Sequence, residues 1–277
     1  MRLGTLRTDD HTVAVRVDQD EAVQIEGASD VGVLLADPQW RTAAERAAGR
    51  RFDLSALEPT AWAPVIPRPS KIICIGLNYR QHIMEMGREL PSHPTMFAKY
   101  PEALIGAFDD IVLPRLSEQV DWEGELAVIV GRTVRDASAA DAADAIAGYT
   151  VINDVTVRDF QYRTTQWLQG KTFEATAPFG PHVVTADAWE AGSQLSTLVA
   201  DEVVQDASTA DLVFGPADLV AYVSRIVTLQ PGDVIATGTP GGVGHARKPP
   251  RYLTAGDVLR TRIDGLGEQR NRVTTRD

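Results

Sequence analysis

The chain has 277 residues, 44% of them hydrophobic, which is enough to bury a full-sized core in one large domain or in a large and a small one. Its formal net charge of −11 repels phosphate backbones, and no basic stripe with interleaved aromatics offsets that field, which argues against a nucleic-acid partner. No stretch approaches the roughly 20 apolar residues of a membrane span, and the first residues lack the apolar core of a secretory signal. The single cysteine, Cys74, lies in an apolar run, so we expect a cytoplasmic protein with a buried thiol.

The N-terminal quarter is predicted to differ from the rest of the chain. Residues 12–17 alternate like a strand, and the Ala- and Arg-rich segment 40–51 suits a helix. Three prolines between residues 61 and 70 restrict the backbone and remove hydrogen-bond donors, which is typical of a linker. We therefore expect a small N-terminal domain over residues 1–65 and a main domain over residues 66–277.

The main domain is predicted to be β-dominated, with a few packed helices. Short β-branched runs bounded by turn residues predict strands at 71–76, 125–130, 149–153, 183–185 and 233–237. A helix is expected over 139–147, with Ser138 as its N-cap and Gly148 beyond its end. Another begins at Pro216, and an Asp-Gly turn within residues 258–273 predicts a hairpin. The fold class is therefore α+β, dominated by strands.

Two glutamates precede the apolar run 125–130. On a strand, residues two apart share a face, so Glu123 and Glu125 point the same way at the start of a buried strand. Two uncompensated carboxylates would be costly there, and a cation is the simplest remedy. Carboxylates are hard ligands and no Cys/His cluster competes, which favours Mg²⁺, Mn²⁺ or Ca²⁺ over Zn²⁺. Two exposed glutamates at a strand end are the alternative.

Other side chains could complete such a site. Asp154 ends an apolar run and is either a third ligand or a turn cap. Lys171 follows a glycine and either polarises a carbonyl or forms a surface salt bridge. His82 and Glu85 share a face if their segment is helical, and form either a water-activating pair or a solvated pair.

A glycine-rich loop over residues 237–244 follows a predicted strand. Its backbone N–H groups could surround an oxyanion or carboxylate, although a purely structural loop is the alternative. No G-K-[S/T] follows, so it is not a P-loop, and Pro249 and Pro250 disfavour the long helix of a dinucleotide fingerprint. We expect no nucleotide cofactor.

In this order, the segments resemble the fumarylacetoacetate hydrolase family. The resemblance lies in the runs GLNYRQHIMEMG (76–87), DWEGEL (121–126), NDVTVRD (153–159), QGKTF (169–173), TGTPGGVG (237–244) and RKPPRYL (247–253), and in a closing G-x-G-x-x-R-N (265–271). The resemblance covers about residues 71–273, nearly the whole predicted main domain.

The resemblance implies a family-specific mixed β-roll, a homodimer and one Mg²⁺ or Mn²⁺ per subunit. By position, the implied metal carboxylates are Glu123, Glu125 and Asp154. The implied catalytic residues are His82, Glu85 and Lys171, the first two on a segment that closes over the substrate. The groups implied to hold the oxo-acid end are Arg158, Gln161, Gly238 and Thr239. The tyrosine-catabolic enzyme that names the family has an extra aspartate ligand where this chain has Asn78-Tyr79, so the chain is more similar to the acylpyruvase-like branch.

The resemblance implies a metal-dependent hydrolase that cleaves a C–C bond in a small β-diketo or acylpyruvate-type oxo-acid through an enolate. An isomerase, tautomerase or decarboxylase of a related oxo-diacid is the alternative, because these reactions share the enolate and the ligands. Retention of His82, Glu85 and Lys171 argues against a non-catalytic metal-stabilised scaffold. The missing fingerprint argues against a nicotinamide-dependent oxidoreductase.

Overall fold

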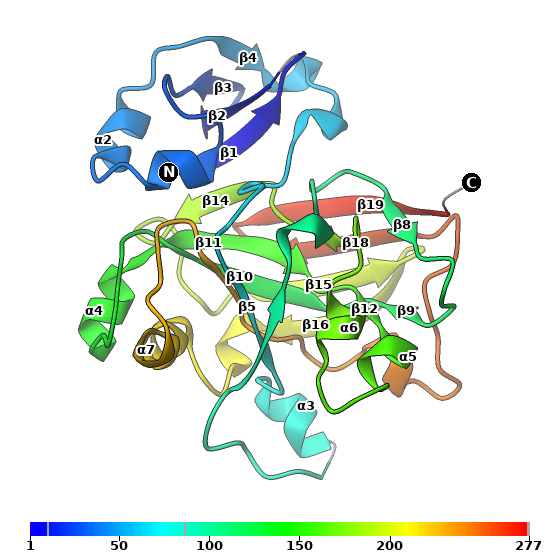
Figure 1. The fold of residues 1–277 in the computed structure, drawn as a ribbon. Helices are drawn as coiled ribbons and strands as arrows, with labels where there is room; N and C mark the ends of the chain where they lie inside the picture. The colour runs from blue at the N-terminus through cyan, green and yellow to red at the C-terminus, as the bar shows by residue number, and fades with distance from the viewer. Residues whose placement is uncertain (10, 86, 276–277) are drawn as a thin grey trace.

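A ten-stranded mixed sheet dominates the fold (Figure 1). The computed structural model describes residues 1–9, 11–85 and 87–275, and of Glu85 only the backbone. In spatial order the strands are β4 (Arg51–Asp53), β3 (Glu21–Gln24), β2 (Thr12–Val17), β1 (Arg2–Arg7), β14 (His182–Thr185), β11 (Ile146–Asn153), β10 (Gly124–Val130), β17 (Val234–Ala236), β5 (Ile72–Gly76) and β6 (Thr95–Lys99). The prediction of a strand-dominated fold is confirmed.

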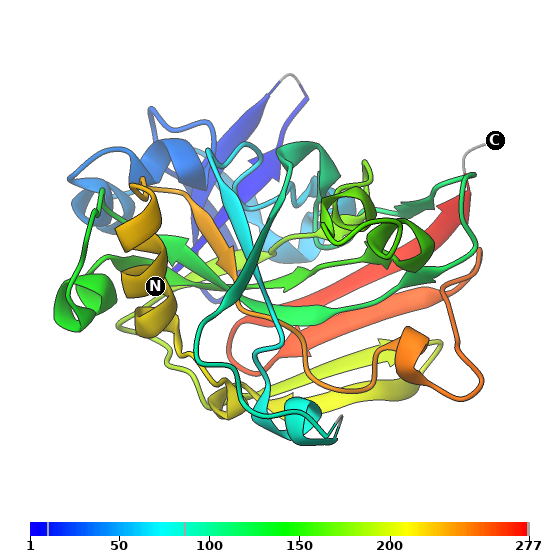
Figure 2. The same cartoon turned by 60° about the horizontal axis from the view of Figure 1, so that its bottom comes forward.

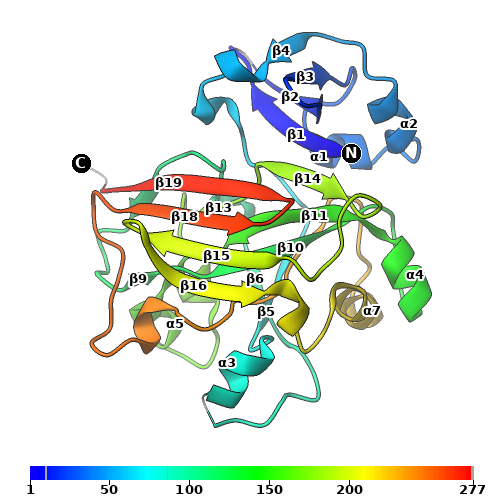
Figure 3. The ribbon, with the colours of Figure 1, turned by 180° about the vertical axis from the view of Figure 1, so that it is seen from behind.

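A second, five-stranded sheet packs against β10 and β11 (Figure 3). Its strands are β16 (Glu202–Ser208), β15 (Gln194–Val199), β18 (Val258–Ile263), β19 (Gly267–Thr275) and β8 (Ile111–Leu113). The predicted hairpin is confirmed as β18 and β19. Two short ladders add β9 (Val120–Asp121) with β12 (Thr156–Val157), and β7 (Leu104–Ile105) with β13 (Ala177–Pro178). Because β10 and β11 are covered on both faces, they are buried along their whole length.

The helices are short and lie around the sheets. They are α1 (Val31–Leu35), α2 (Trp40–Glu45), α3 (Arg80–Glu85), α4 (Ala139–Asp144), α5 (Arg158–Gln161), α6 (Leu168–Lys171) and α7 (Pro216–Ile226). Figures 1 and 2 show α4 and α7 side by side. Ser138 caps α4 as predicted, but the helix ends before residue 147 because Ile146 already begins β11. Likewise, the helix expected over 40–51 ends at Glu45, and Arg51 begins β4.

The N-terminal strands extend the main sheet. β1 pairs with β14, and Leu3 belongs to the same apolar cluster as Ile72 and Phe179. The proline-rich segment expected to be a linker is packed rather than loose. Val65 is fully buried, donates its N–H to the Phe179 carbonyl and accepts from the Thr5 hydroxyl. The division at residue 65 stays a prediction about independent folding.

Candidate metal centre and active site

Four strand ends meet at one edge of the ten-stranded sheet. β10 runs antiparallel to both β11 and β17, while β17 runs parallel to β5. The start of β10 therefore lies beside the ends of β11, β17 and β5, and each strand is followed or preceded by polar residues there. Figure 2 brings this side of the molecule forward, with α3 and the 3₁₀ helix η5 (Gly244–Ala246).

Three carboxylates converge at this edge. Glu123, Glu125 and Asp154 each offer an oxygen, and these atoms all lie within 4.8 Å of one another. Glu125 and Asp154 are almost completely buried, and Glu123 is only 7% exposed. The structure thus brings together all three residues predicted as metal ligands.

Backbone contacts hold two of these carboxylates in place. Glu123 lies just before β10 rather than on it, and its N–H donates to the side-chain oxygen of Asn153 over 2.9 Å. The Asp154 N–H donates to the Glu123 carbonyl over 2.8 Å. The Asn153 amide in turn donates to the Thr261 hydroxyl over 2.9 Å, which ties this corner to the second sheet.

Two buried lysines neutralise part of the cluster. The Lys171 Nζ atom lies 2.5 Å from Glu123 Oε2 and 3.0 Å from Asp154 Oδ2, and Lys99 Nζ lies 2.8 Å from Asp154 Oδ1. Burial works against the charge on Asp154, but Lys171 and Lys99 outweigh it and lower its pKa. Burial also disfavours the Lys171 ammonium, yet Asp154 and Glu123 raise its pKa above the ordinary value. Lys171 is therefore a cation at neutral pH.

Glu125 carries the charge that most needs compensation. It accepts the Gly238 N–H over 2.8 Å, and burial together with the charges of Asp154 and Glu123 raises its pKa well above the ordinary value. Gly238 has φ +98°, and a Cβ there would lie 2.8 Å from the Ile75 carbonyl oxygen, so glycine is required. A hard divalent cation among these oxygens would remove the penalty, so the residues fit Mg²⁺ or Mn²⁺.

A buried arginine connects the cluster to a fourth carboxylate. Arg158 lies 2.8 Å from Glu123 Oε1 and 2.7 Å from Asp121 Oδ2, and donates to the Gln161 side-chain oxygen over 2.9 Å. Asp121 also accepts the backbone N–H of Gly244 and that of His245. The guanidinium predicted to hold substrate is thus largely occupied by contacts with Asp121, Glu123 and Gln161.

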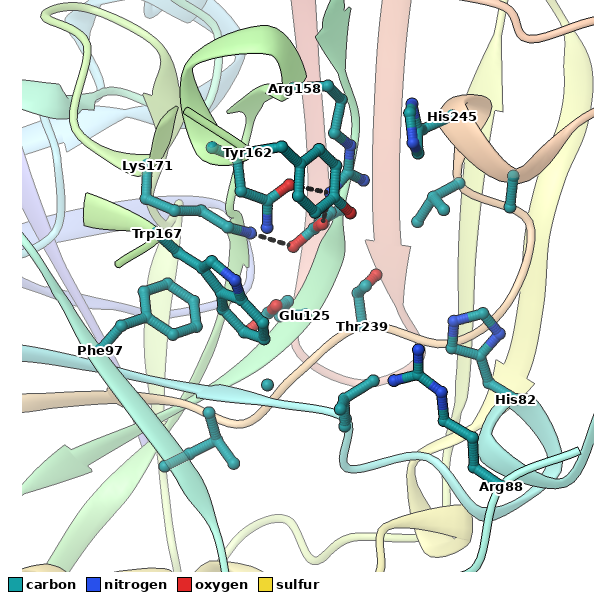
Figure 4. A pocket seen from close by; sticks show the side chains of 17 residues that line it. His82, Arg88, Phe97, Glu125, Arg158, Tyr162, Trp167, Lys171, Thr239 and His245 are labelled. Atoms are coloured by element: carbon teal, nitrogen blue, oxygen red, sulfur yellow. Dashed lines mark hydrogen bonds and ion pairs between the residues drawn. The ribbon is translucent and has the colours of Figure 1, made fainter. Parts of the chain in front are cut away.

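Two of the carboxylates, Glu123 and Glu125, line a pocket of about 280 Å³ (Figure 4), and Asp154 lies buried behind them. Lys171, Arg158 and Gln161 line it, as do Thr239 and His82. On one side Phe97 and Trp167 pack edge to face, with ring centroids 5.4 Å apart. The pocket is therefore apolar on one wall and densely charged at its base.

Thr239, Gly238 and Glu85 are the predicted site residues that remain, and the structure places each of them differently. Thr239 lies in the pocket wall, donates to the Gly124 carbonyl over 3.0 Å and accepts from Gln205 over 2.8 Å. The Gly238 amide binds Glu125 rather than facing the pocket as a free donor. Glu85 ends α3, but its side chain lies outside the described part of the chain, so its pairing with His82 stays a prediction.

Sequence reasoning did not find several pocket and cluster residues. Lys99 and Asp121 are completely buried or nearly so, and Arg88, Trp167 and His245 line the pocket. Asp121 stands two residues before Glu123, so its proximity to the ligand motif was a usable signal. Lys99 ends a strand that is remote in sequence, and only the sheet order brings it to Asp154.

A family profile described as fumarylacetoacetate (FAA) hydrolase C-terminal matches residues 71–274. The chain therefore belongs to the fumarylacetoacetate hydrolase family, as its motifs predicted. The match begins at β5 and ends in β19, so it contains both sheets' site-forming strands and the whole carboxylate cluster.

Known relatives include isomerases and tautomerases. The human protein named oxaloacetate tautomerase FAHD2A, mitochondrial, is 45% identical over 220 residues, which cover 78% of this chain and 70% of that protein. A solved structure of 2-hydroxyhepta-2,4-diene-1,7-dioate isomerase from Mycobacterium marinum has a TM-score of 0.81 and 32% identity, covering 100% of this chain and 99% of that one. A fumarylacetoacetate hydrolase from Exiguobacterium antarcticum has a TM-score of 0.89 and 33% identity, with both chains covered completely.

Proposed function

We propose that this protein is a divalent-metal-dependent tautomerase or isomerase that interconverts the keto and enol forms of a small 2-oxo acid of the oxaloacetate type. The observation that carries the proposal is the buried cluster of Glu123, Glu125 and Asp154, with the Lys171 ammonium on two of its members. The names of the relatives favour this reaction over the C–C hydrolysis that the motifs first suggested.

The three carboxylates would hold Mg²⁺ or Mn²⁺. The ion, when bound, supplies a Lewis acid for the oxo-acid oxygens. Lys171 is protonated because two carboxylates surround it, so it can donate a hydrogen bond to the substrate oxygen that gains negative charge as the enol forms. Phe97 and Trp167 exclude water from one side, which strengthens that interaction.

Tautomerisation moves one proton between carbon and oxygen and breaks no C–C bond. It needs no water molecule positioned for attack, whereas hydrolysis does. The presence of His82 in the pocket wall is the observation that keeps a C–C hydrolase as the second candidate. Hydrolysis requires a water-activating base such as His82, so substitution of His82 should abolish it. Tautomerisation does not require that base, so it should continue when His82 is substituted.

The test uses chelator-stripped protein with and without added Mg²⁺ or Mn²⁺. Enol-oxaloacetate, acetylpyruvate and a hydroxy-dienedioate are followed by loss of ultraviolet enol absorbance, and products are identified by mass. We expect metal-dependent, mass-neutral loss of the enol form, faster than with the same metal and no protein. Release of two acids would assign hydrolysis, and CO₂ release would assign decarboxylation.

Three variants sharpen the test. Glu125→Gln should abolish metal-dependent turnover, while Glu26→Gln, an exposed change of the same type in the N-terminal region, should not. His82→Ala should retain at least a tenth of the tautomerase activity. Full turnover by metal-free Glu125→Gln protein would refute the metal centre.

A further inference from the structure

The basic side chains that line the pocket, Lys171, Arg158 and Arg88, differ in their carboxylate partners. Lys171 contacts Glu123 and Asp154, and Arg158 contacts Glu123 and Asp121. Arg88 lines the same pocket, but no carboxylate in the described part of the chain forms an ion pair with it. Its guanidinium therefore has a charge and a fork of N–H donors available to a ligand.

The backbone of Arg88 is fixed by the turn that ends α3. Its N–H donates to the Ile83 carbonyl over 3.2 Å, and the Gly87 N–H donates to the Met84 carbonyl over 2.9 Å. Gly87 has φ +67°, so the pair of bonds forms the left-handed helix terminus known as a Schellman motif. Ile83, only 2% exposed, anchors the helix in the core. The turn thus fixes the position of the Arg88 backbone, from which the side chain extends.

From that position the side chain enters the pocket opposite the carboxylates. Figure 4 shows the Arg88 guanidinium beside His82 and Thr239, on the other side of the pocket from Lys171 and Phe97. A 2-oxo acid whose oxo and first carboxylate groups occupy the metal end would extend its remaining atoms across the pocket. Arg88 is then a cation at the substrate's distal end.

We propose that Arg88 binds the second carboxylate of a dicarboxylic 2-oxo acid and so selects diacids over monoacids of the same length. This inference rests on the proposed function and names its substrate class. The overall charge of −11 repels a dianion, so a local cation is needed to hold it. A guanidinium matches a carboxylate in a bidentate geometry that an ammonium cannot reproduce.

The kinetic test compares oxaloacetate with 2-oxobutanoate, which has a methyl group in place of the distal carboxylate. Exchange of the C3 hydrogens for deuterium is followed by NMR with Mg²⁺ for wild type, Arg88→Met and Arg88→Lys. Arg46→Met, which removes an exposed charge far from the pocket, is the matched control. We expect the diacid-to-monoacid ratio of kcat/KM to fall about tenfold to a hundredfold in Arg88→Met, less in Arg88→Lys and not in Arg46→Met.

A binding test separates this proposal from the proposed function. Malate and 2-hydroxybutanoate differ in the same way but cannot enolise, and their affinities for the Mg²⁺-loaded proteins are measured by calorimetry. Wild type should prefer malate at least tenfold, and Arg88→Met should lose that preference while binding oxalate, which carries only the chelating end, as wild type does. An unchanged malate preference in Arg88→Met overturns the role of Arg88. Absent enolisation in wild type would refute only the tautomerase assignment.

Discussion

At the level of single residues, Glu123 and Glu125 converge for a reason that differs from simple strand alternation. Only Glu125 lies on β10, and Glu123 precedes the strand, held by Asn153 and by the Asp154 N–H. The two carboxylates still reach one point because the start of β10 and the end of β11 are paired neighbours. The ligand motif is thus completed by contacts between strands.

Lys171 also has a structural role that can be tested without substrate. In metal-free protein, Lys171→Met leaves Glu123 and Asp154 with one buried cation fewer, which should destabilise the fold by about 3–5 kcal/mol. Mn²⁺ replaces the missing charge, so the rise in Tm on adding Mn²⁺ should be larger in the variant than in wild type. Thermal unfolding by circular dichroism measures both. An equal Mn²⁺ effect in the two proteins would contradict this account.

At the level of elements, the contact between β1 and β14 joins the N-terminal strands to the rest. His182 of β14 is paired with Gly4 of β1, and its ring packs edge-on against Trp62 with centroids 4.6 Å apart. Its Nε2 atom is buried without a hydrogen-bond partner among the described residues. Burial, with a smaller effect of Arg2, lowers the pKa of His182 to about 4.

This shift predicts a pH-dependent weakness at the β1–β14 contact. In the unfolded chain His182 binds a proton near the ordinary pKa of 6.5, and in the folded chain only near 4. The contribution of neutral His182 to the free energy of unfolding is therefore fully present above pH 6.5 and is lost as the pH falls towards 4. The loss should reach about 3 kcal/mol. His182→Phe keeps the aromatic contact and cannot be protonated, so its unfolding free energy should fall less between pH 7 and pH 5. Parallel pH profiles of the two proteins would rule this out.

At the level of the whole molecule, the N-terminal strands and the main domain share one sheet and one apolar cluster. Deleting residues 1–65 would expose the edge of β14 and the apolar residues that β1 covers. We expect the fragment 66–277 to aggregate or to melt well below the full chain, as measured by size-exclusion chromatography and circular dichroism. A monodisperse fragment with an unchanged Tm would establish two independent domains.

The sequence also led to predictions about membrane spans, the oligomeric state, the cellular location and the metal. No helix among the described residues is long and apolar enough to span a membrane. The homodimer and the cytoplasmic location remain predictions. The carboxylates suit several hard cations, so the assays with added Mg²⁺ or Mn²⁺ described above would identify the ion that supports turnover.

The sequence by itself determined the local features of this protein. Alternating apolar runs, the Ser138 cap and the Asp-Gly hairpin turn predicted the start of each expected main-domain helix and several strands, namely β2, β5, β10, β11, β14, β17, β18 and β19. The order of the motifs predicted the family. These signals are local because propensity, capping and turn chemistry act over a few residues. Element ends were less accurate, because at Ile146 and Arg51 strand pairing overrides the helical pattern.

Tertiary structure alone decided which distant residues meet. Lys99 reaches Asp154, Asp121 reaches Arg158, and Arg88 faces the carboxylates from the turn after α3. It also decided that the proline-rich segment is packed and that β1 extends the main sheet. Such contacts depend on strand order and register, which link segments far apart in the chain. A single sequence carries no local pattern for that order, so these pairings could be found only in the folded molecule.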